Sequence, residues 1–167
     1  MQIRLEHPSD ETAIYRVTEL AFDAKSHTQN AEARIVRALR ADGNLTLSLV
    51  AETGGGIAGH IAFSPVAIDG QHADWFGLGP LSVRPDRQRQ GIGSALVERG
   101  LAALRARGAK GCVVLGDPGY YGRFGFVSDG ALRYGDVPTR FVQRIVFQGD
   151  APPGEITYAR AFDLGGP

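Results

Sequence analysis

The chain has 167 residues, with 18 basic and 18 acidic side chains, and so carries no formal net charge at pH 7. That length is enough for one domain with a substantial core and short for two. The neutral balance argues against a molecule built as a whole to bind nucleic acid or a membrane surface. No apolar run approaches the ~20 residues of a transmembrane helix. The first residues lack the pattern of a secretion signal, and a single cysteine is compatible with the cytoplasm.

Two helices are predicted in the first quarter of the chain, after a short strand at residues 2–6. The first helix begins at an acidic turn after Pro8, and its apolar stripe consists of Ile14, Val17, Leu20 and Ala21. A polar loop is expected at residues 25–29. Asn30 can then cap the second helix, which Asp42-Gly43 ends.

Three strands follow, at residues 45–52, 57–68 and 75–83, and they predict an antiparallel meander. Gly59 and Pro65 lie inside the middle strand and predict a bulge or a bent edge there. Asp69-Gly70 is a strong hairpin signal between the second and third strands.

The third of these strands leads into a turn with the spacing Gly91-x-Gly93, followed by a helix. The helix has one apolar face, formed by Ile92, Leu96, Val97, Leu101 and Leu104. Glycines let a ligand approach the backbone closely, and the start of a helix leaves N–H groups unpaired. Together they favour an anion such as a pyrophosphate. Positive charge is added around the turn by Arg84, Arg87 and Arg89.

Two common nucleotide motifs do not fit this turn. A dinucleotide fingerprint needs a third glycine where Leu96 stands, and a Walker A loop needs a Lys followed by Ser or Thr. The pattern that fits is Gln/Arg-x-x-Gly-x-Gly/Ala, at residues 88–93. It resembles the acetyl-CoA signature of the GNAT superfamily of N-acetyltransferases. Residues 115–126 add a Tyr-x-x-x-Gly-Phe element, in a Gly-Asp-Pro-x-Tyr-Tyr version that resembles the YhbS-like predicted acetyltransferases.

The resemblance implies an α+β fold in which helices flank a central, mostly antiparallel mixed sheet with one splayed parallel strand pair. The second strand of that pair is the buried run at residues 112–115, beside the strand at 75–83. Asp117-Pro118 predicts a short helix, and residues 141–147 and 155–159 predict two closing strands. We expect one domain at residues 1–164, followed by a loose tail at residues 165–167.

The resemblance also implies a function, which is acetyl transfer from acetyl-CoA to a primary amine by direct attack in a ternary complex. The acceptor would be a small-molecule or protein amine, held by the first two helices and the loop at residues 129–139. Whether the chain forms a homodimer stays open. The cofactor-binding residues implied are Leu81, Ser82, Val83, Gln88, Arg89, Gln90, Gly91, Ile92, Gly93, Ser94, Tyr121 and Phe124. The backbones of Leu81 and Val83 would bond the pantetheine arm, and the turn would hold the pyrophosphate.

Tyr121 is the implied general acid, because it stands where the family carries a tyrosine that protonates the departing thiolate. Tyr120 is its rival. The general base stays open, because the strand that enters the glycine turn lacks the glutamate found in many family members. The alternatives are the side chains His60, His72, Asp74 and Asp117, or a water relay. Asp117 is also well placed to cap the short helix.

Cys112 lies in an apolar run and predicts a buried structural thiol rather than a nucleophile. The four histidines are scattered, and no metal site is predicted. Two other functions stay open from the sequence. One is a non-catalytic CoA-binding sensor or interaction module, which the missing glutamate would favour. The other is a domain that binds a different phosphate ligand at the glycine turn.

Overall fold

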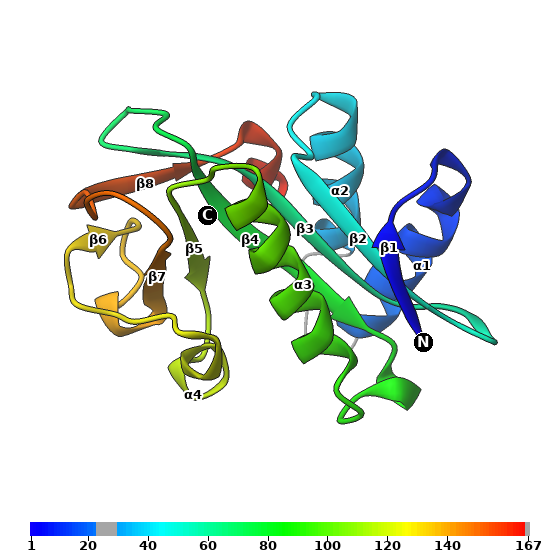
Figure 1. Cartoon of the computed structure of the whole chain (residues 1–167). Helices are drawn as coiled ribbons and strands as arrows, with labels where there is room; N and C mark the ends of the chain where they lie inside the picture. Colours follow the sequence, from blue (N-terminus) through cyan, green and yellow to red (C-terminus); the bar gives the residue numbers. More distant parts are fainter. Residues whose placement is uncertain (23–29, 166–167) are drawn as a thin grey trace.

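The computed structural model describes residues 1–22 and 30–165, and a mixed sheet runs through the whole of that part. The strands are β1 (Gln2–Leu5), β2 (Leu47–Thr53), β3 (Gly56–Ile68), β4 (Trp75–Val83), β5 (Gly111–Leu115), β6 (Leu132–Arg133), β7 (Val142–Val146) and β8 (Gly154–Tyr158). The helices are α1 (Glu11–Phe22), α2 (Ala31–Ala41), α3 (Ile92–Ala106) and α4 (Pro118–Tyr121). Helix α3 covers one face of the sheet, and α1 and α2 cover the other (Figure 1).

The main sheet has the strand order β1-β2-β3-β4-β5-β7. The predicted meander of β2, β3 and β4 is confirmed, as is the parallel pairing of β4 with β5. Strand β6 was not predicted, because two residues give no readable periodicity. It pairs in parallel with β8, which in turn pairs with the end of β3, so the described residues hold a second, short parallel pair.

Strand β2 shows why the sheet is covered on both faces, because its side chains alternate between two cores. Leu49 and Ala51 face the large core under α3. Val50, between them, packs against Ile14 of α1 and Val36 of α2. A strand buried on both faces reads as a continuous apolar run, which is what residues 47–51 show apart from Ser48.

Two details of the first helices differ from the prediction. Leu20 is 39% exposed, whereas Thr18 is buried and bonds the carbonyl of Ile14 at 2.8 Å. A helix advances 3.6 residues per turn, so position 18 returns to the face of Ile14 and position 20 does not. Asn30 stands at the N-cap of α2, but its φ of 62° is left-handed and its side chain makes no capping bond. The predicted loop at residues 25–29 lies outside the described residues.

Of the two alternatives predicted for β3, the bulge is confirmed and the bent edge is wrong. Strand β2 pairs with residues 56–63 of β3, and β4 pairs with residues 59–65 on the other side. The bulge lies at Ala58, which has no partner between the pairs Ala51–Gly59 and Glu52–Ile57. Gly59 serves a different purpose. A Cβ there would lie 3.0 Å from side-chain atoms of both Ile92 and Leu96, so glycine lets the start of α3 approach the sheet.

Pro65 marks the point where β3 changes neighbours. The pairing with β2 ends at Phe63, and residues 66–68 pair with β8 instead. A proline has no N–H to give to a ladder, so it suits the interval between two partners.

The two strands of the main parallel pair separate after three residues, which confirms the splayed junction. Residues 75–77 of β4 pair with residues 111–113 of β5, and the described pairing then stops. On the other side of β4, Gly79 and Pro80 together stand opposite Ala62 of β3, which is a bulge in β4. Strand β5 meanwhile continues beside β7 up to the pair Leu115–Val142. A gap therefore opens between the carboxyl ends of β4 and β5.

The C-terminal residues pack against α2. The residue expected to begin the loose tail, Gly165, ends a 3-10 segment at Arg160–Gly165. Within that segment Ala161 is buried against Leu39, and Arg160 forms an ion pair with Asp42 at 2.8 Å. Residues 166–167 lie outside the described ranges.

The close packing of α3 on β3 gives a prediction about stability. A Cβ at Gly100 would lie 2.3 Å from a ring carbon of Phe63, which is fully buried. Overpacking of a core costs about 1–3 kcal/mol. A contact this short belongs in the upper half of that range, and the helix propensity of alanine offsets about 1 kcal/mol. We expect Gly100→Ala to lower the free energy of unfolding in urea by about 1–2 kcal/mol.

Gly122→Ala is the matched control, because nothing lies within 4 Å of a Cβ there. Adding Phe63→Leu to Gly100→Ala should recover part of the loss by making room. A stability equal to that of the wild type in Gly100→Ala would contradict this account of the interface.

Candidate active site

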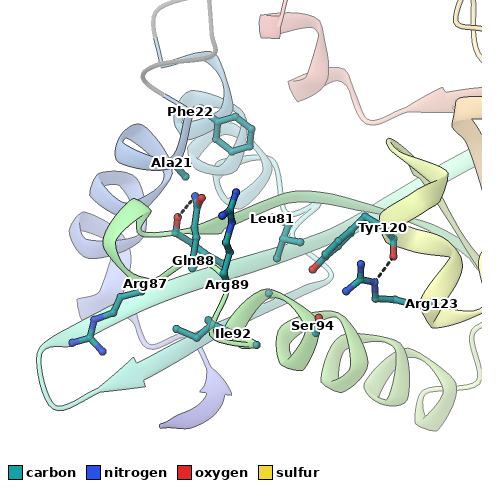
Figure 2. A pocket seen from close by; sticks show the side chains of 13 residues that line it. Ala21, Phe22, Leu81, Arg87, Gln88, Arg89, Ile92, Ser94, Tyr120 and Arg123 are labelled. Atoms are coloured by element: carbon teal, nitrogen blue, oxygen red, sulfur yellow. Dashed lines mark hydrogen bonds between the residues drawn. The ribbon is translucent and has the colours of Figure 1, made fainter.

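A cavity of about 730 Å³ lies where β4 ends and α3 begins (Figure 2). Helix α1 contributes Ala21 and Phe22, and the segment after β5 contributes Tyr120 and Arg123. The remaining lining residues belong to the predicted cofactor site or its flank: Leu81, Val83, Arg87, Gln88, Arg89, Gly91, Ile92, Gly93 and Ser94. The structure therefore brings most of the predicted cofactor residues to one hollow.

Four of the predicted cofactor residues do not line this cavity. Ser82 is buried in the sheet, and Gln90 is exposed outside the cavity. Phe124 lines a separate hollow beside α3, together with Leu101 and Ile145. Tyr121 lines a second cavity, described below.

The glycine turn has unpaired backbone N–H groups of the kind that can bind an anion. Gly91 is the N-cap of α3 with a φ of +84°, a conformation that favours glycine, and no side chain caps the helix there. The N–H groups of residues 92–94 have no intrahelical acceptors, because they belong to the first turn. A Cβ on Gly93 would lie 3.0 Å from the hydroxyl of Tyr120, so there is little room at this position. Figure 2 shows Tyr120 extending from α4 toward that first turn.

Beyond Gly77, the edge of β4 that faces the gap has no described strand partner. The N–H of Arg84 donates to Ala58 of β3 at 2.9 Å. Because backbone groups in an antiparallel strand alternate in direction, Leu81 and Val83 point away from β3 and toward the opening. The side chain of Gln88 donates to the carbonyl of Val83 at 3.2 Å, which fixes this glutamine at the mouth of the cavity.

All charged side chains on the described walls of this cavity are arginines, namely Arg87, Arg89 and Arg123. Arg84 is not among them, and Asp86 neutralises it at 2.9 Å. Arg123 was missed by the sequence analysis, although it lies inside the Tyr-x-x-x-Gly-Phe element. Its guanidinium lies 4.7 Å from the ring centre of Tyr120 and donates to the carbonyl of the same residue at 2.9 Å. The cavity is therefore suited to a ligand with several negative charges.

A second cavity of about 460 Å³ adjoins the first and shares Phe22 and Leu81 with it. It occupies the gap between the separated strands. Its described walls are Phe22, Glu32, Ile35, Leu78, Gly79, Pro80, Leu81, Leu115, Tyr121, Tyr134, Tyr158, Phe162 and Gly165. Sequence reasoning expected the first two helices and the loop at residues 129–139 to form an acceptor site, and this cavity draws on all three.

The two adjacent tyrosines face different cavities, with perpendicular rings 5.0 Å apart. Tyr120 lines the arginine-lined cavity, and Tyr121 lines the second one. Burial, followed by the neighbouring Tyr120 and Cys112, raises the pKa of Tyr121 to about 12. Tyr121 therefore keeps its proton at neutral pH and has it available to donate.

None of the residues considered as a general base lines either cavity. His72 and Asp74 are exposed in the hairpin before β4, at the opposite end of that strand from the glycine turn. Asp117 caps α4, where its side chain accepts from the N–H of Gly119 at 2.8 Å. The cap expected from the sequence is thereby confirmed.

His60 is fully buried in a chain of polar side chains. Its Nε2 lies 2.8 Å from the hydroxyl of Ser48, which donates to Glu6, and Glu6 accepts from Arg40 at 2.9 Å. Since the proton of Ser48 goes to a carboxylate, Nε2 of His60 is the donor to Ser48. Burial lowers the pKa of His60 to about 4, while Glu6 raises it and Arg40 lowers it to smaller extents. This histidine is a neutral structural group.

The other reactive groups are structural as well. Cys112 is fully buried, and burial raises the pKa of its thiol well above the usual value. The described residues contain no group of three or more His, Cys, Asp or Glu side chains arranged to hold a metal ion. Among the helices in the described ranges, none is long and apolar enough to span a membrane.

The fold and the two adjoining cavities are those expected of a protein that binds a phosphate-bearing ligand next to a second ligand. Known proteins narrow this class. The chain matches the family described as "Acetyltransferase (GNAT) domain" over residues 44–128. The N-acetyltransferase YhbS of Escherichia coli K12 is 42% identical over 127 residues, which are 75% of this chain and 73% of YhbS.

Two solved structures support the same family assignment. A GNAT family acetyltransferase from Brucella melitensis in complex with acetyl-CoA has a TM-score of 0.87 and 49% identity, with 97% of each chain covered. YhbS from Escherichia coli in complex with CoA has a TM-score of 0.88 and 34% identity, with 97% of this chain and 91% of that chain covered. This chain therefore belongs to the GNAT family and is an N-acetyltransferase. None of these relatives supports the non-catalytic alternative.

The buried histidine predicts how stability depends on pH. The pKa of His60 is about 4 in the folded protein and 6.5 as the reference for an unfolded chain. Below pH 6.5 the unfolded state therefore binds a proton that the folded state does not, and the folded state loses stability as the pH falls. We expect the free energy of unfolding to drop by about 2 kcal/mol between pH 6.5 and pH 4.5.

Urea denaturation at a series of pH values measures this drop. His60→Gln removes the titration, so its free energy of unfolding should change less over the same interval, whatever its absolute value. Identical pH slopes for the two proteins would show that another group is responsible.

The glycine turn gives a prediction about cofactor binding. Gly93→Val adds three carbons between the first turn of α3 and the hydroxyl of Tyr120, where a single Cβ already lies at 3.0 Å. We expect the affinity for acetyl-CoA, measured by calorimetry, to fall at least about 10-fold, or about 1.4 kcal/mol.

Gly54→Val is the control, because it lies in the turn before β3 with nothing within 4 Å of its Cβ position. Equal dissociation constants for the wild type and Gly93→Val would place the pyrophosphate elsewhere.

Proposed function

We propose that this chain transfers an acetyl group from acetyl-CoA to a primary amine by direct attack in a ternary complex. The observation that carries the proposal is the meeting of two cavities at Leu81 and Phe22, one lined by arginines and one without them. Donor and acceptor can therefore be bound together, with the gap between β4 and β5 as their meeting point.

The residues present fit acetyl-CoA as the donor, which would supply a thioester carbonyl. The N–H groups of residues 92–94, with Arg87, Arg89 and Arg123, would hold its phosphates. The backbone groups of Leu81 and Val83 face the opening and would bond its amide-containing arm. The relatives that were solved with acetyl-CoA or CoA support this assignment.

Tyr121 is proposed as the general acid. It lines the gap, whereas Tyr120 lies beside the glycine turn. A phenol that stays protonated at neutral pH can give its proton to the departing sulfur, which improves a thiolate as a leaving group. The raised pKa of about 12 keeps that proton in place until charge develops on the sulfur.

Replacing Tyr121 with Phe tests the acid role, because it removes one hydroxyl and almost no volume. General acid catalysis is typically worth 10²–10⁴-fold. A thiol is a fair leaving group unaided, so we expect kcat to fall roughly 10- to 100-fold, about 1.4–2.7 kcal/mol. The loss should appear about equally in kcat and kcat/KM for an accepted amine, with acetyl-CoA affinity unchanged.

Tyr120→Phe is the internal control. Its hydroxyl lies near the first turn of α3, so its loss should alter the KM for acetyl-CoA by a small factor and leave kcat unchanged. Thiol release at saturating acetyl-CoA measures all three proteins. Full activity in Tyr121→Phe would remove the acid role, and a large loss of kcat in Tyr120→Phe alone would transfer that role to Tyr120.

A further inference from the structure

The second cavity has a mostly apolar wall with a single charged side chain. Glu32 is the one charged residue on its described walls, and the others are aliphatic, aromatic, Gly or Pro. Glu32 lies in the first turn of α2, where the sequence alone indicates only a favourable interaction with the helix dipole. The tertiary structure instead brings it to the same cavity as Tyr121.

The carboxylate of Glu32 is incompletely satisfied. Its Oε2 is buried and has no hydrogen-bond partner in the part of the chain that the structure describes. A buried carboxylate oxygen without a donor carries a desolvation cost that a bound cation or donor relieves. No lysine, arginine or histidine is present on the described walls to do so. The negative charge of Glu32 therefore has no cationic partner on the described walls, and a positively charged ligand can supply one.

The other residues of the wall indicate which chemical group the ligand carries besides its positive charge. The rings of Tyr134 and Tyr158 meet edge to face with centroids 5.2 Å apart, and Phe162 lies 5.0 Å from Tyr158. Ile35, Leu78 and Leu115 add aliphatic surface. Aromatic walls bind apolar or aromatic groups and also attract an ammonium. A second ammonium on the ligand would meet no second carboxylate on the described walls.

We propose that this cavity binds the acceptor as a small monoamine with an apolar, preferably aromatic, body and that Glu32 holds its ammonium group. The proposal rests on the proposed function and adds the class of substrate and the residue that receives its proton. It also gives a candidate for the general base. Glu32 and Tyr121 line the same cavity, whereas the four side chains considered earlier line neither cavity.

The proton balance of the transfer is then complete. One proton of the ammonium passes to the Glu32 carboxylate and is later released to water. The nitrogen forms a bond to the thioester carbon as the carbon–sulfur bond breaks. Tyr121 gives its proton to the sulfur, and the second proton leaving the nitrogen restores the tyrosine through water. The products are an amide, a free thiol and one released proton.

The first experiment compares amines with the wild-type enzyme and acetyl-CoA. Phenethylamine carries one ammonium and an aromatic body, n-butylamine has a small aliphatic body, and putrescine carries two ammonium groups. We expect kcat/KM for phenethylamine to exceed that for putrescine by at least about 30-fold, because the described walls hold no second carboxylate for the second ammonium. Equal or better use of putrescine would overturn the proposed substrate class and leave the acetyltransferase function intact.

The second experiment tests the residue with Glu32→Gln, which keeps the shape and removes the charge. A hydrogen bond to a charged group corresponds to about 10- to 100-fold in kcat/KM for phenethylamine. The loss should shrink as the pH rises and free amine becomes abundant, and Glu32→Asp should retain part of the activity. Glu98→Gln, exposed on α3, is the matched control and should match the wild type. Unchanged kcat/KM in Glu32→Gln would overturn the role of Glu32.

Calorimetry separates a failure of this inference from a failure of the proposed function. Phenethylamine is titrated into the CoA-bound wild type and Glu32→Gln, while acetyl-CoA binding is measured as a reference for both. Binding of phenethylamine by the wild type that is weakened at least about 10-fold in Glu32→Gln supports the site even without turnover. No binding to the wild type, or equal binding to both proteins, overturns the inference although acetyl-CoA still binds.

Discussion

The separation of β4 from β5 is the constraint on which both cavities depend. Strand β4 keeps its pairing with β3 through a bulge at Gly79 and Pro80, while β5 keeps its pairing with β7 up to Leu115. Pairing β4 with β5 over their full length would break the hydrogen bonds of β4 with β3 or those of β5 with β7. The backbone groups of β4 beyond Gly77 therefore face an opening, and a group that would otherwise need a strand partner is available to a ligand.

The start of α3 depends on the same constraint. Helix α3 follows β4 after residues 84–91, which include a 3-10 turn at Pro85–Arg87, and this connection returns its unpaired N–H groups to the open edge of that strand. Gly59 permits this arrangement from the opposite strand, because it leaves space for Ile92 and Leu96 against the sheet. The anion site and the open strand edge are thus held by one packed interface rather than by mobile side chains.

The polar groups of the interior divide into two kinds. The chain that joins Arg40, Glu6, Ser48 and His60 satisfies most of its members internally, which is how a buried histidine stays neutral and structural. The Nδ1 of His60 and the hydroxyls of Ser64 and Ser82 are also buried without a partner, but these residues line neither cavity. Glu32 differs, because its unpartnered oxygen belongs to a side chain on a cavity wall. A buried polar group with partners contributes to the core, and one without partners on a cavity wall is a candidate for binding.

Local patterns determined much of this protein. The glycine spacing at Gly91 and Gly93, the apolar face of α3 and the Asp117 cap each depend on residues close in sequence, and each was readable from it. Strand β6 and the bulge at Gly79-Pro80 were not, because they depend on pairing with distant strands. The same holds for Phe124, which the resemblance grouped with the cofactor and the fold places in another hollow.

Which side chains share a cavity was decided only by the tertiary structure. Glu32 of α2, Tyr121 of α4 and Phe162 near the C-terminus come together through the packing of helices on a splayed sheet. Periodicity tells which face of an element is buried, but it carries no information about the distant element that this face will meet. The sequence therefore determined the family and the glycine turn at the start of α3, and only long-range packing decided which side chains line the second cavity.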